Sequence, residues 1–306
     1  NMADDVFHMN TQEIIDFLIR LAKENDLAKL RRQNSNDSSL QELIESLTKR
    51  AQLLEESVGK RYFTLQKLGS GGFGSVFLCA DLEDNDKHVV VKEINTGLSQ
   101  EERDFILREV EKLRILAPLT ENRVPRVHAY FSEEDKMYIV QDYIPGMDCS
   151  KYLQKYGVFH EKEILDFLRQ VVSVLAIVHA QRIIHRDIKP SNIMIKFNQN
   201  GKSYHLIDFG ISKQLTNTQI AAETIAGTPG FVGPEVWQQH TVFQSDFFSL
   251  GITCLVLLGL KERESPHIAL FRMHLAASTK RLLRSLIEID WRERPKNCES
   301  ILQMLE

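Results

Sequence analysis

The segment Ile183–Ile195, IIHRDIKPSNIMI, constrains the chain more than any other, because histidine, arginine, aspartate, lysine and asparagine side chains interrupt an apolar run. Polar groups are costly to bury without hydrogen-bond partners, so this pattern indicates a chemical task. Asp187 can orient a hydroxyl group and accept its proton, and Lys189 can neutralise a phosphoryl group in transfer. Asn192 offers an amide oxygen to a hard cation such as Mg²⁺, and Asp208 in LIDFG adds a carboxylate sixteen residues later. Together these residues predict metal-assisted phosphoryl transfer.

A glycine-rich stretch, LGSGGFGSV, lies earlier in the chain and has G-x-G-x-x-G spacing at Gly69, Gly71 and Gly74. Glycines let backbone N–H groups approach phosphate oxygens because no Cβ intervenes. The spacing alone is a weak signal, which dinucleotide-binding folds share. In those folds the glycines open a helix, whereas residues 75–80, SVFLCA, are typical of a strand. The absence of a G-x-x-x-x-G-K-[ST] segment excludes a Walker P-loop.

Lys92 ends the apolar strand pattern VVVK, 18 residues after Gly74. A lysine at this position can bind the α- and β-phosphates of a nucleotide if an acidic side chain holds it in place. Glu109, in the helical segment ILREVEKL, is the natural candidate because it shares the inward side of the helix with Leu113. Glu111 is the competitor, but two residues away it points to another face of the helix.

These motifs, in this order and spacing, resemble the eukaryotic-type (Hanks-type) protein kinase family over residues 62–306. The resemblance implies an α+β fold of two lobes, in which a β-rich N-lobe precedes a helical C-lobe. It gives the three loop glycines the role of covering the phosphates, and it pairs Lys92 with Glu109. It makes Asp187 the catalytic base and assigns Mg²⁺ to Asn192 and Asp208. The nucleotide-binding residues that it adds are Leu68, Val76, Val90, Gln141, Asp142, Tyr143 and Met194.

Two features of the adenine-binding region follow from the resemblance. Gln141 falls where the family gates the back of the adenine pocket, usually with an apolar residue, so an amide should make the pocket more polar. Asp142 and Tyr143 would form the hinge whose backbone binds adenine.

Later segments match the same family with substitutions. GTPGFVGPE has Gly233 where the family has alanine, and Glu235 should form a structural ion pair with Arg294. SDFFSLG has Asp246 placed to brace the catalytic loop and Phe248 in place of tryptophan. Only 48 residues separate Asp246 from Arg294, so the late helical region should be shorter than usual. VPRVHAYF, IVQDYI, HLIDFG and IAGTPGF are similar to bacterial members, cyanobacterial ones in particular.

Substrate type and regulation also rest on the resemblance. Lys189 and Thr228 resemble the serine/threonine branch, where Thr228 in the substrate segment would bridge Lys189 and the catalytic aspartate. Arg186 and Lys213 are placed to bind a phosphate on the activation segment. Thr224, four residues before Thr228, matches the usual phosphorylated position. We hypothesise that its phosphorylation activates the enzyme, and an unmodified surface threonine is the alternative.

The first 60 residues differ from the rest, with one glycine, no proline and two stretches of helical period that begin after Asn10 and Ser39. They predict a helical extension (1–60) before a kinase domain (61–306) whose lobes divide near residues 143 and 144. Two hypotheses remain for the extension. Its helices dock on the kinase lobes and regulate activity, or they recruit a protein partner or mediate self-association.

Composition limits the setting in which the chain works. A formal charge of −4 gives no basic field, which disfavours nucleic acid as a partner. The longest apolar run, Leu250–Leu260, is too short to span a membrane and should form a buried core helix. No secretory h-region opens the sequence, and the four cysteines stand far apart without C-x-x-C spacing. A soluble cytoplasmic protein is expected, with export by a dedicated apparatus as the alternative.

The sequence therefore predicts an ATP-dependent protein serine/threonine kinase, a transferase that moves the γ-phosphate of ATP to protein hydroxyls and phosphorylates itself. ATP and Mg²⁺ are the expected cofactors, with Mn²⁺ as an alternative metal. The main rival is a pseudokinase-like binding scaffold, which is disfavoured because every catalytic position holds a competent residue. A small-molecule kinase of the aminoglycoside type is disfavoured by the K-P-S insertion before Asn192 and by GTPGFVGPE, since both serve a peptide substrate.

Overall fold

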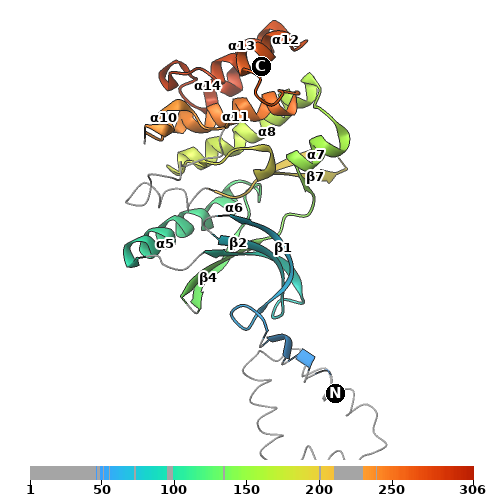
Figure 1. The fold of residues 1–306 in the computed structure, drawn as a ribbon, viewed down its shortest axis with the longest axis vertical. Coiled ribbons are helices and arrows are strands. Elements are labelled where there is room, and N and C mark those ends of the chain that lie inside the picture. Colours follow the sequence, from blue (N-terminus) through green and yellow to red (C-terminus); the bar gives the residue numbers. More distant parts are fainter. Residues whose placement is uncertain are drawn as a thin grey trace, which may run out of the picture. The chain divides into compact units, whose positions relative to one another are not determined.

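The structure is a computed structural model of the 306-residue chain. It describes residues 46, 49–50, 52–54, 56–71, 74–94, 99–133, 135–199, 201–209, 230–238 and 240–306. These residues form two compact units (Figure 1). Unit 1 comprises the described residues up to Gly97 together with His128–Tyr143, and unit 2 comprises those of Leu98–Val127 and Ile144–Glu306.

Unit 1 is built on a five-stranded sheet with the strand order β1-β2-β3-β5-β4. The strands are β1 (Tyr62–Gly71), β2 (Gly74–Asp81), β3 (Lys87–Ile94), β4 (Val127–Glu133) and β5 (Lys136–Asp142). The pairs β1–β2, β2–β3 and β3–β5 are antiparallel. Successive side chains of a strand point to opposite faces of the sheet, and those on one face form a buried core. This core comprises Tyr62, Cys79, Val89, Val91, Tyr138 and Val140.

Unit 2 is mainly helical and includes a small three-stranded sheet of order β6-β7-β8. Its helices are α5 (Gln100–Arg114), α6 (Leu116–Leu119), α7 (Cys149–Tyr156), α8 (Glu161–Ala180), α10 (Pro234–Trp237), α11 (Phe243–Leu257), α12 (Pro266–Arg272), α13 (Ala277–Leu286) and α14 (Cys298–Gln303). Its strands are β6 (Met147–Asp148), β7 (Ile193–Asn198) and β8 (Gly201–Leu206). A β-rich unit and a helical unit confirm the expected α+β fold.

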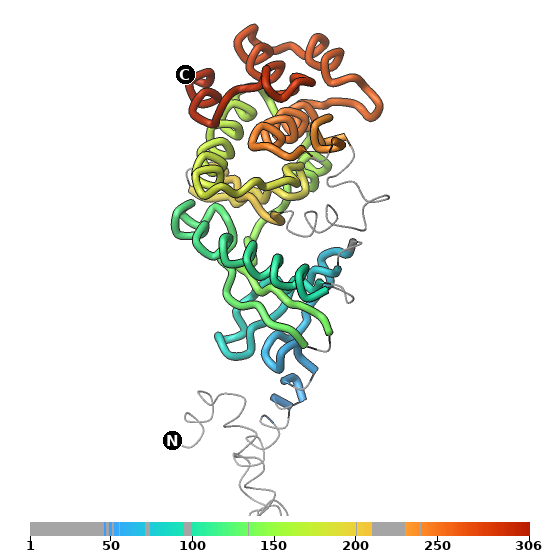
Figure 2. Tube along the Cα trace, turned by 90° about the vertical axis from the view of Figure 1, so that its left-hand side faces the viewer, coloured from blue at the N-terminus to red at the C-terminus, as the bar shows by residue number. Residues whose placement is uncertain are grey.

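Helices α8 and α11 are in contact, and they lie side by side in both views of unit 2 (Figures 1 and 2). Helix α11 is buried almost throughout, as expected of the core helix predicted from Leu250, although the chain leaves the helix after Leu257. No helix among the described residues is long and apolar enough to cross a membrane.

Residues 98–127, which the sequence suggested for the first lobe, group with unit 2 in the structure. Hydrogen bonds tie the end of this stretch to β8. Leu206 N donates to Arg123 O at 2.9 Å, and His205 Nδ1 lies 3.1 Å from Asn122 O. The chain that follows α6 is therefore tied to the small sheet of unit 2.

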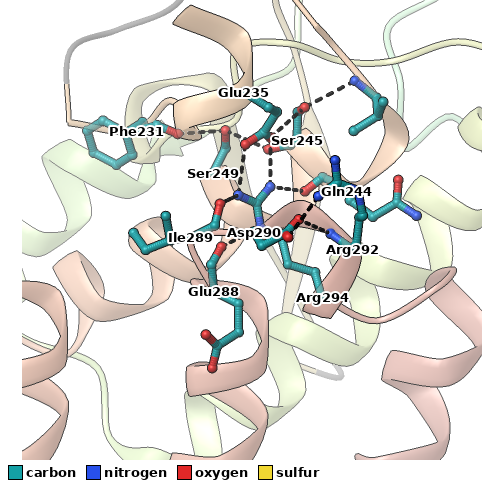
Figure 3. A network of polar contacts seen from close by, with 11 residues as sticks. Phe231, Glu235, Gln244, Ser245, Ser249, Glu288, Ile289, Asp290, Arg292 and Arg294 are labelled. Carbon is teal, nitrogen blue, oxygen red and sulfur yellow. Dashed lines mark hydrogen bonds and ion pairs between the residues drawn. The ribbon is translucent and has the colours of Figure 1, made fainter. Parts of the chain in front are cut away.

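A buried ion pair joins distant parts of unit 2 (Figure 3). The Arg294 guanidinium donates to both carboxylate oxygens of Glu235, at 2.7 and 2.9 Å, and both residues are at most 5% exposed. Its remaining N–H groups donate to the carbonyl oxygens of Glu288, Gln244 and Ile289. All five donors of the guanidinium are thus used. The expected pair of Glu235 and Arg294 is confirmed.

Two departures from the family pattern lie beside this pair. A Cβ at Gly233 would stand 2.6 Å from both carboxylate oxygens of Glu235, so glycine gives the carboxylate the space it occupies. The Arg294 guanidinium lies 4.8 Å from the ring centroid of Phe248, so phenylalanine supplies an aromatic face for the buried cation.

We predict that Glu235→Gln lowers the free energy of unfolding by about 3–5 kcal/mol, because it leaves the Arg294 charge buried without a counter-ion. Chemical denaturation of both proteins would measure the loss. The matched control is Glu264→Gln, which removes a carboxylate from the solvent-exposed partner Arg272 and should leave the midpoint unchanged. Equal midpoints for Glu235→Gln and the wild type would contradict a stabilising role.

The same pair predicts a pH dependence. Burial alone would raise the pKa of Glu235, but hydrogen bonds, above all from Arg294, outweigh it and lower the pKa from the ordinary value of 4.5. A carboxyl group with a lowered pKa stabilises the fold above its unfolded-state pKa, and that contribution is lost as the pH falls through the folded-state pKa. The free energy of unfolding should therefore decline below pH 4.5, and less steeply in Glu235→Gln. Denaturant titrations across this range would measure both slopes, and parallel slopes would contradict the prediction.

Candidate functional site

The sheet of unit 1 gathers four of the candidate nucleotide-binding side chains on one face. The register places Val76 opposite Lys92 and Val90 opposite Gln141. Directly opposed residues share a face, and so do alternate residues along a strand, so all four side chains lie on the same side of the sheet. This side is opposite to the buried core that contains Val91. Gln141 is 8% exposed, and its role beside the adenine pocket stays a prediction.

The glycine-rich stretch forms the end of the β1–β2 hairpin, where Gly71 pairs with Gly74. Gly74 has φ +149°, and a Cβ there would stand 1.8 Å from Glu93 O, so the backbone itself requires glycine. A Cβ at Gly69 would meet no atom within 4 Å, so packing does not require glycine at that position. Leu68 lies at a register shift between Lys67 and Gly69 and is 46% exposed.

The residues at the end of β5 have polar and aromatic partners within unit 1. Asp142 Oδ1 lies 2.7 Å from His128 Nε2. The ring of Tyr143 meets His88 edge to face, with a centroid separation of 6.1 Å. These contacts fix two side chains of the expected hinge.

In unit 2 the carboxylate of Asp246 holds the loop that precedes Asp187. Asp246 Oδ1 accepts from Arg186 N at 2.9 Å, and Oδ2 accepts from His185 N at 2.9 Å. Oδ2 also lies 2.8 Å from His179 Nε2. Burial alone would raise the pKa of Asp246, but the hydrogen bond and charge of His179 contribute most to lowering it, so the carboxylate stays ionised. Arg186 has φ +67°, a costly conformation for a non-glycine residue, and these bonds stabilise it.

Asp187, Lys189 and Asn192 converge in the structure. Asn192 Nδ2 donates to Asp187 O and to Asp187 Oδ2, both at 2.8 Å. Lys189 Nζ lies 3.3 Å from Asp187 Oδ2. Because both Asn192 amide hydrogens serve Asp187, the amide oxygen is left to accept or to ligate elsewhere. The carboxylate is held between an ammonium and an amide.

Asp208 follows β8, and the register of β7 and β8 brings the chain before it, at Ile207, next to Asn192. Ile193 pairs with Leu206, and Ile207 N donates to Asn192 O at 3.0 Å. Asn192 and Asp208 therefore flank the same end of this hairpin. Asp208 has φ +59°, again a rare conformation for a non-glycine residue.

His185 connects the two segments, a role that the sequence analysis did not assign. Its Nδ1 accepts from Asp187 N at 3.3 Å, and its Nε2 lies 3.0 Å from Ile207 O. Its ring centroid is 4.4 Å from that of Phe209. Burial lowers the pKa of this fully buried imidazole, which favours the neutral form. Because Nδ1 accepts from Asp187 N, the hydrogen of the neutral ring lies on Nε2, which faces Ile207 O. A histidine inside an apolar run was the only signal for this role.

Glu109 lies on α5 with 14% of its side chain exposed, whereas the side chain of Glu111 is 49% exposed. Glu109 forms an ion pair with Lys112. Burial lowers the pKa of Arg186, and the negative charge of Glu109 offsets part of that decrease. Lys92 belongs to unit 1, so its ion pair with Glu109 stays a prediction.

The other candidate residues are less informative or lie outside the described part of the chain. Met194 on β7 pairs with His205 and Asp148 in the small sheet of unit 2. Lys213, Thr224 and Thr228 lie outside the described residues. The described residues hold no cluster of three histidine, cysteine or acidic side chains that could bind a metal ion.

Comparison with known proteins identifies the family. The model of the protein kinase domain matches residues 62–305. Serine/threonine-protein kinase B of Synechocystis sp. is 31% identical over 269 residues, which cover 80% of this chain and 46% of that protein. Serine/threonine-protein kinase PknA of Nostoc sp. is 34% identical over 230 residues, which cover 70% of this chain and 40% of that protein. The chain thus spans less than half the length of these relatives, and both support the expected bacterial resemblance.

A solved structure shows the same fold at low sequence identity. Rad53 in complex with AMP-PNP superposes with a TM-score of 0.65 and 20% identity, covering 85% of this chain and 69% of that one. With a family model that matches most of the sequence, and with the bracing contacts and the buried ion pair in place, the chain belongs to the protein kinase family.

Proposed function

We propose that the chain transfers the γ-phosphate of ATP to serine and threonine hydroxyls of proteins, including its own. The observation that carries the proposal is the convergence of Lys189 and Asn192 on the carboxylate of Asp187. As the acceptor oxygen bonds to the γ-phosphorus, the bond to the β-phosphate oxygen breaks and ADP leaves. Asp187 orients the hydroxyl and takes its proton, and Lys189 offsets charge on the transferring group.

The oxygen atoms around Asp187 fit a magnesium ion better than a metal that needs a closed protein cage. Asn192 has an amide oxygen to offer, and Asp208 supplies a carboxylate from the same end of the β7–β8 hairpin. Mg²⁺ commonly takes one or two protein oxygens and completes its shell with phosphates and water, which suits a site without three acidic or histidine ligands. When bound, the metal would neutralise charge on the β- and γ-phosphates. Mn²⁺ could use the same oxygens.

The hairpin of unit 1 is assigned to the nucleotide phosphates. Gly74 is required by its backbone, but Gly69 has open space around it, so close approach of a phosphate remains the physical reason for glycine there. Lys92 is assigned to the α- and β-phosphates, with Glu109 as its partner. The apolar contacts with the nucleotide are assigned to Leu68, Val76, Val90 and Met194, the polar gate to Gln141, and adenine binding to the backbone of Asp142 and Tyr143. The AMP-PNP bound to Rad53 is consistent with a nucleotide site in this fold.

Residues 1–60 are proposed as an extension that regulates the kinase domain (61–306) or binds a protein partner or a second copy. The two lobes of that domain are proposed to divide near residues 143 and 144. A serine- or threonine-containing protein is the substrate, and the cytoplasm is the proposed site of action.

We predict that Asp208→Asn lowers phosphate transfer from radiolabelled ATP at least about a hundredfold, because metal-ion charge stabilisation is worth several kcal/mol. Transfer to myelin basic protein and to the chain itself would be measured with Mg²⁺, and phosphoamino-acid analysis should find label on serine or threonine.

The control is Asp104→Asn, which changes an exposed aspartate on α5 and should keep wild-type activity. Wild-type protein that binds ATP without transferring phosphate would favour the pseudokinase scaffold. Full activity in Asp208→Asn would show that the Asp208 carboxylate is not needed to hold the metal ion.

The regulatory hypothesis gives a second prediction. Phosphorylated Thr224 would accept charge-assisted hydrogen bonds from Arg186 and Lys213, each worth about 1.5–3 kcal/mol. Thr224→Ala should therefore lower kcat at least about tenfold. Thr218→Ala, in the same segment, is the control and should retain activity. Mass spectrometry of fully active protein in which Thr224 carries no phosphate would reject the hypothesis.

A further inference from the structure

The position of the phosphate-binding hairpin depends on how its base is held. Strand β1 is an edge strand of the five-stranded sheet, and its residues 64–70 are exposed. Its pairing with β2 shifts register twice, between Thr64 and Gln66 and between Lys67 and Gly69. Such irregularities bend the strand that carries them and increase its local twist. Gly74 also pairs with Ile94 of β3, whereas Gly69 and Gly71 pair with β2 alone, so their position depends further on contacts at the base of β1, near Tyr62 and Asp81.

Residues just before β1 hold this base. Arg61 makes a bidentate pair with Asp81, with Nε and Nη2 at 2.6 and 2.8 Å from the two carboxylate oxygens. Leu82 N donates to Arg61 O at 3.0 Å, which extends the β1–β2 pairing by one step. Val58 and Tyr62 exchange two backbone hydrogen bonds, of 3.0 and 3.1 Å. The chain is thus folded back on itself immediately before the hairpin.

A helical piece further upstream contacts the end of β2. Leu54 is 4% exposed and packs with Ala80 and Leu82. Arg50 donates to the carbonyl oxygen of Leu82 and forms an ion pair of 3.2 Å with Asp86. One apolar contact and two polar contacts therefore attach this piece to the β2–β3 connection.

Gly59 joins the same segment to β4. Its φ is +59°, and a Cβ there would stand 2.8 Å from the ring of Phe131. Its N–H donates to Glu133 Oε2 at 2.9 Å. The Phe131 ring is stacked between those of Tyr62 and Tyr138, at centroid distances of 6.0 and 5.3 Å. The turn is thus packed against the aromatic core that also holds the first residue of β1.

The kinase family model begins at Tyr62, so these contacts come from residues that the family match does not include. We propose that the described residues of 50–61, the hairpin clamp, are positioning residues that pre-organise the glycine hairpin for nucleotide phosphates. This inference rests on the proposed function, because it takes the hairpin as the phosphate site. Pre-organisation reduces the ordering cost of binding. A loosened clamp should therefore weaken nucleotide binding and leave kcat at saturating ATP little changed.

The test compares Leu54→Ala, Arg50→Ala and Arg50→Lys, each in the 306-residue chain, with the unsubstituted chain, using AMP-PNP with Mg²⁺ as the probe. Calorimetry should show a Kd about five- to tenfold higher for both alanine variants, with KM for ATP rising in parallel and kcat within about twofold. Arg50→Lys keeps the charge and should recover part of the affinity. Lys49→Ala removes an exposed neighbour on the same helical piece and is the matched control.

Hydrogen exchange gives a readout that does not need activity. Amides of residues 62–71 should exchange faster in Leu54→Ala and Arg50→Ala than in the wild type, while those of β5 should not change. Gly59→Ala tests the other end of the clamp and should show the same pattern. Unchanged hairpin exchange, or a lower melting temperature with an unchanged Kd, would overturn the positioning role. Wild-type protein that binds no AMP-PNP would refute the proposed function instead, and the exchange data would still decide on the clamp.

Discussion

The candidate catalytic residues depend on one buried carboxylate. Asp246, fully buried on α11, accepts hydrogen bonds from the backbone of His185 and Arg186 and lies against the ring of His179. A buried charge is costly unless it is fully partnered, and here the partners are the backbone groups that must be fixed. The Asp246 carboxylate therefore sets the conformation of the loop that ends in Asp187. Because Asp187 directly follows the two residues that Asp246 holds, this constraint also places the candidate catalytic carboxylate.

The other candidate site residues lie on or beside two antiparallel strand pairs, and the register of each pair decides which of their side chains lie close together. In unit 2 the β7–β8 register brings Asn192 and Asp208 to one end of a hairpin, and His185 links that end to Asp187. In unit 1 the antiparallel register puts Val76 and Lys92 on one face of the sheet. A slip of one residue would turn each of these side chains to the opposite face, so the buried core that fixes the register also fixes the candidate site.

The substitutions that set this chain apart from its family have local physical reasons. Glycine at 233 leaves room for the Glu235 carboxylate, and phenylalanine at 248 lies under the Arg294 cation. The segment before β1 adds contacts of its own, from Arg50 and Gly59 among others. Phe248 thus links Arg294 to α11, the helix that carries Asp246, and Arg50 links the segment before β1 to the end of β2.

The sequence by itself determined the family and the α+β class, and it predicted Asp187, Asn192 and Asp208 as a candidate set, because phosphoryl-transfer chemistry restricts residue type and spacing along the chain. Tertiary structure decided which groups orient them. The bridging role of His185 and the tie between the residues after α6 and β8 arise from hydrogen bonds between distant segments. The contact of Leu54 with β2 also joins residues far apart in sequence. Local patterns carry no record of such partners, since many sequences with the same periodicity would pack differently.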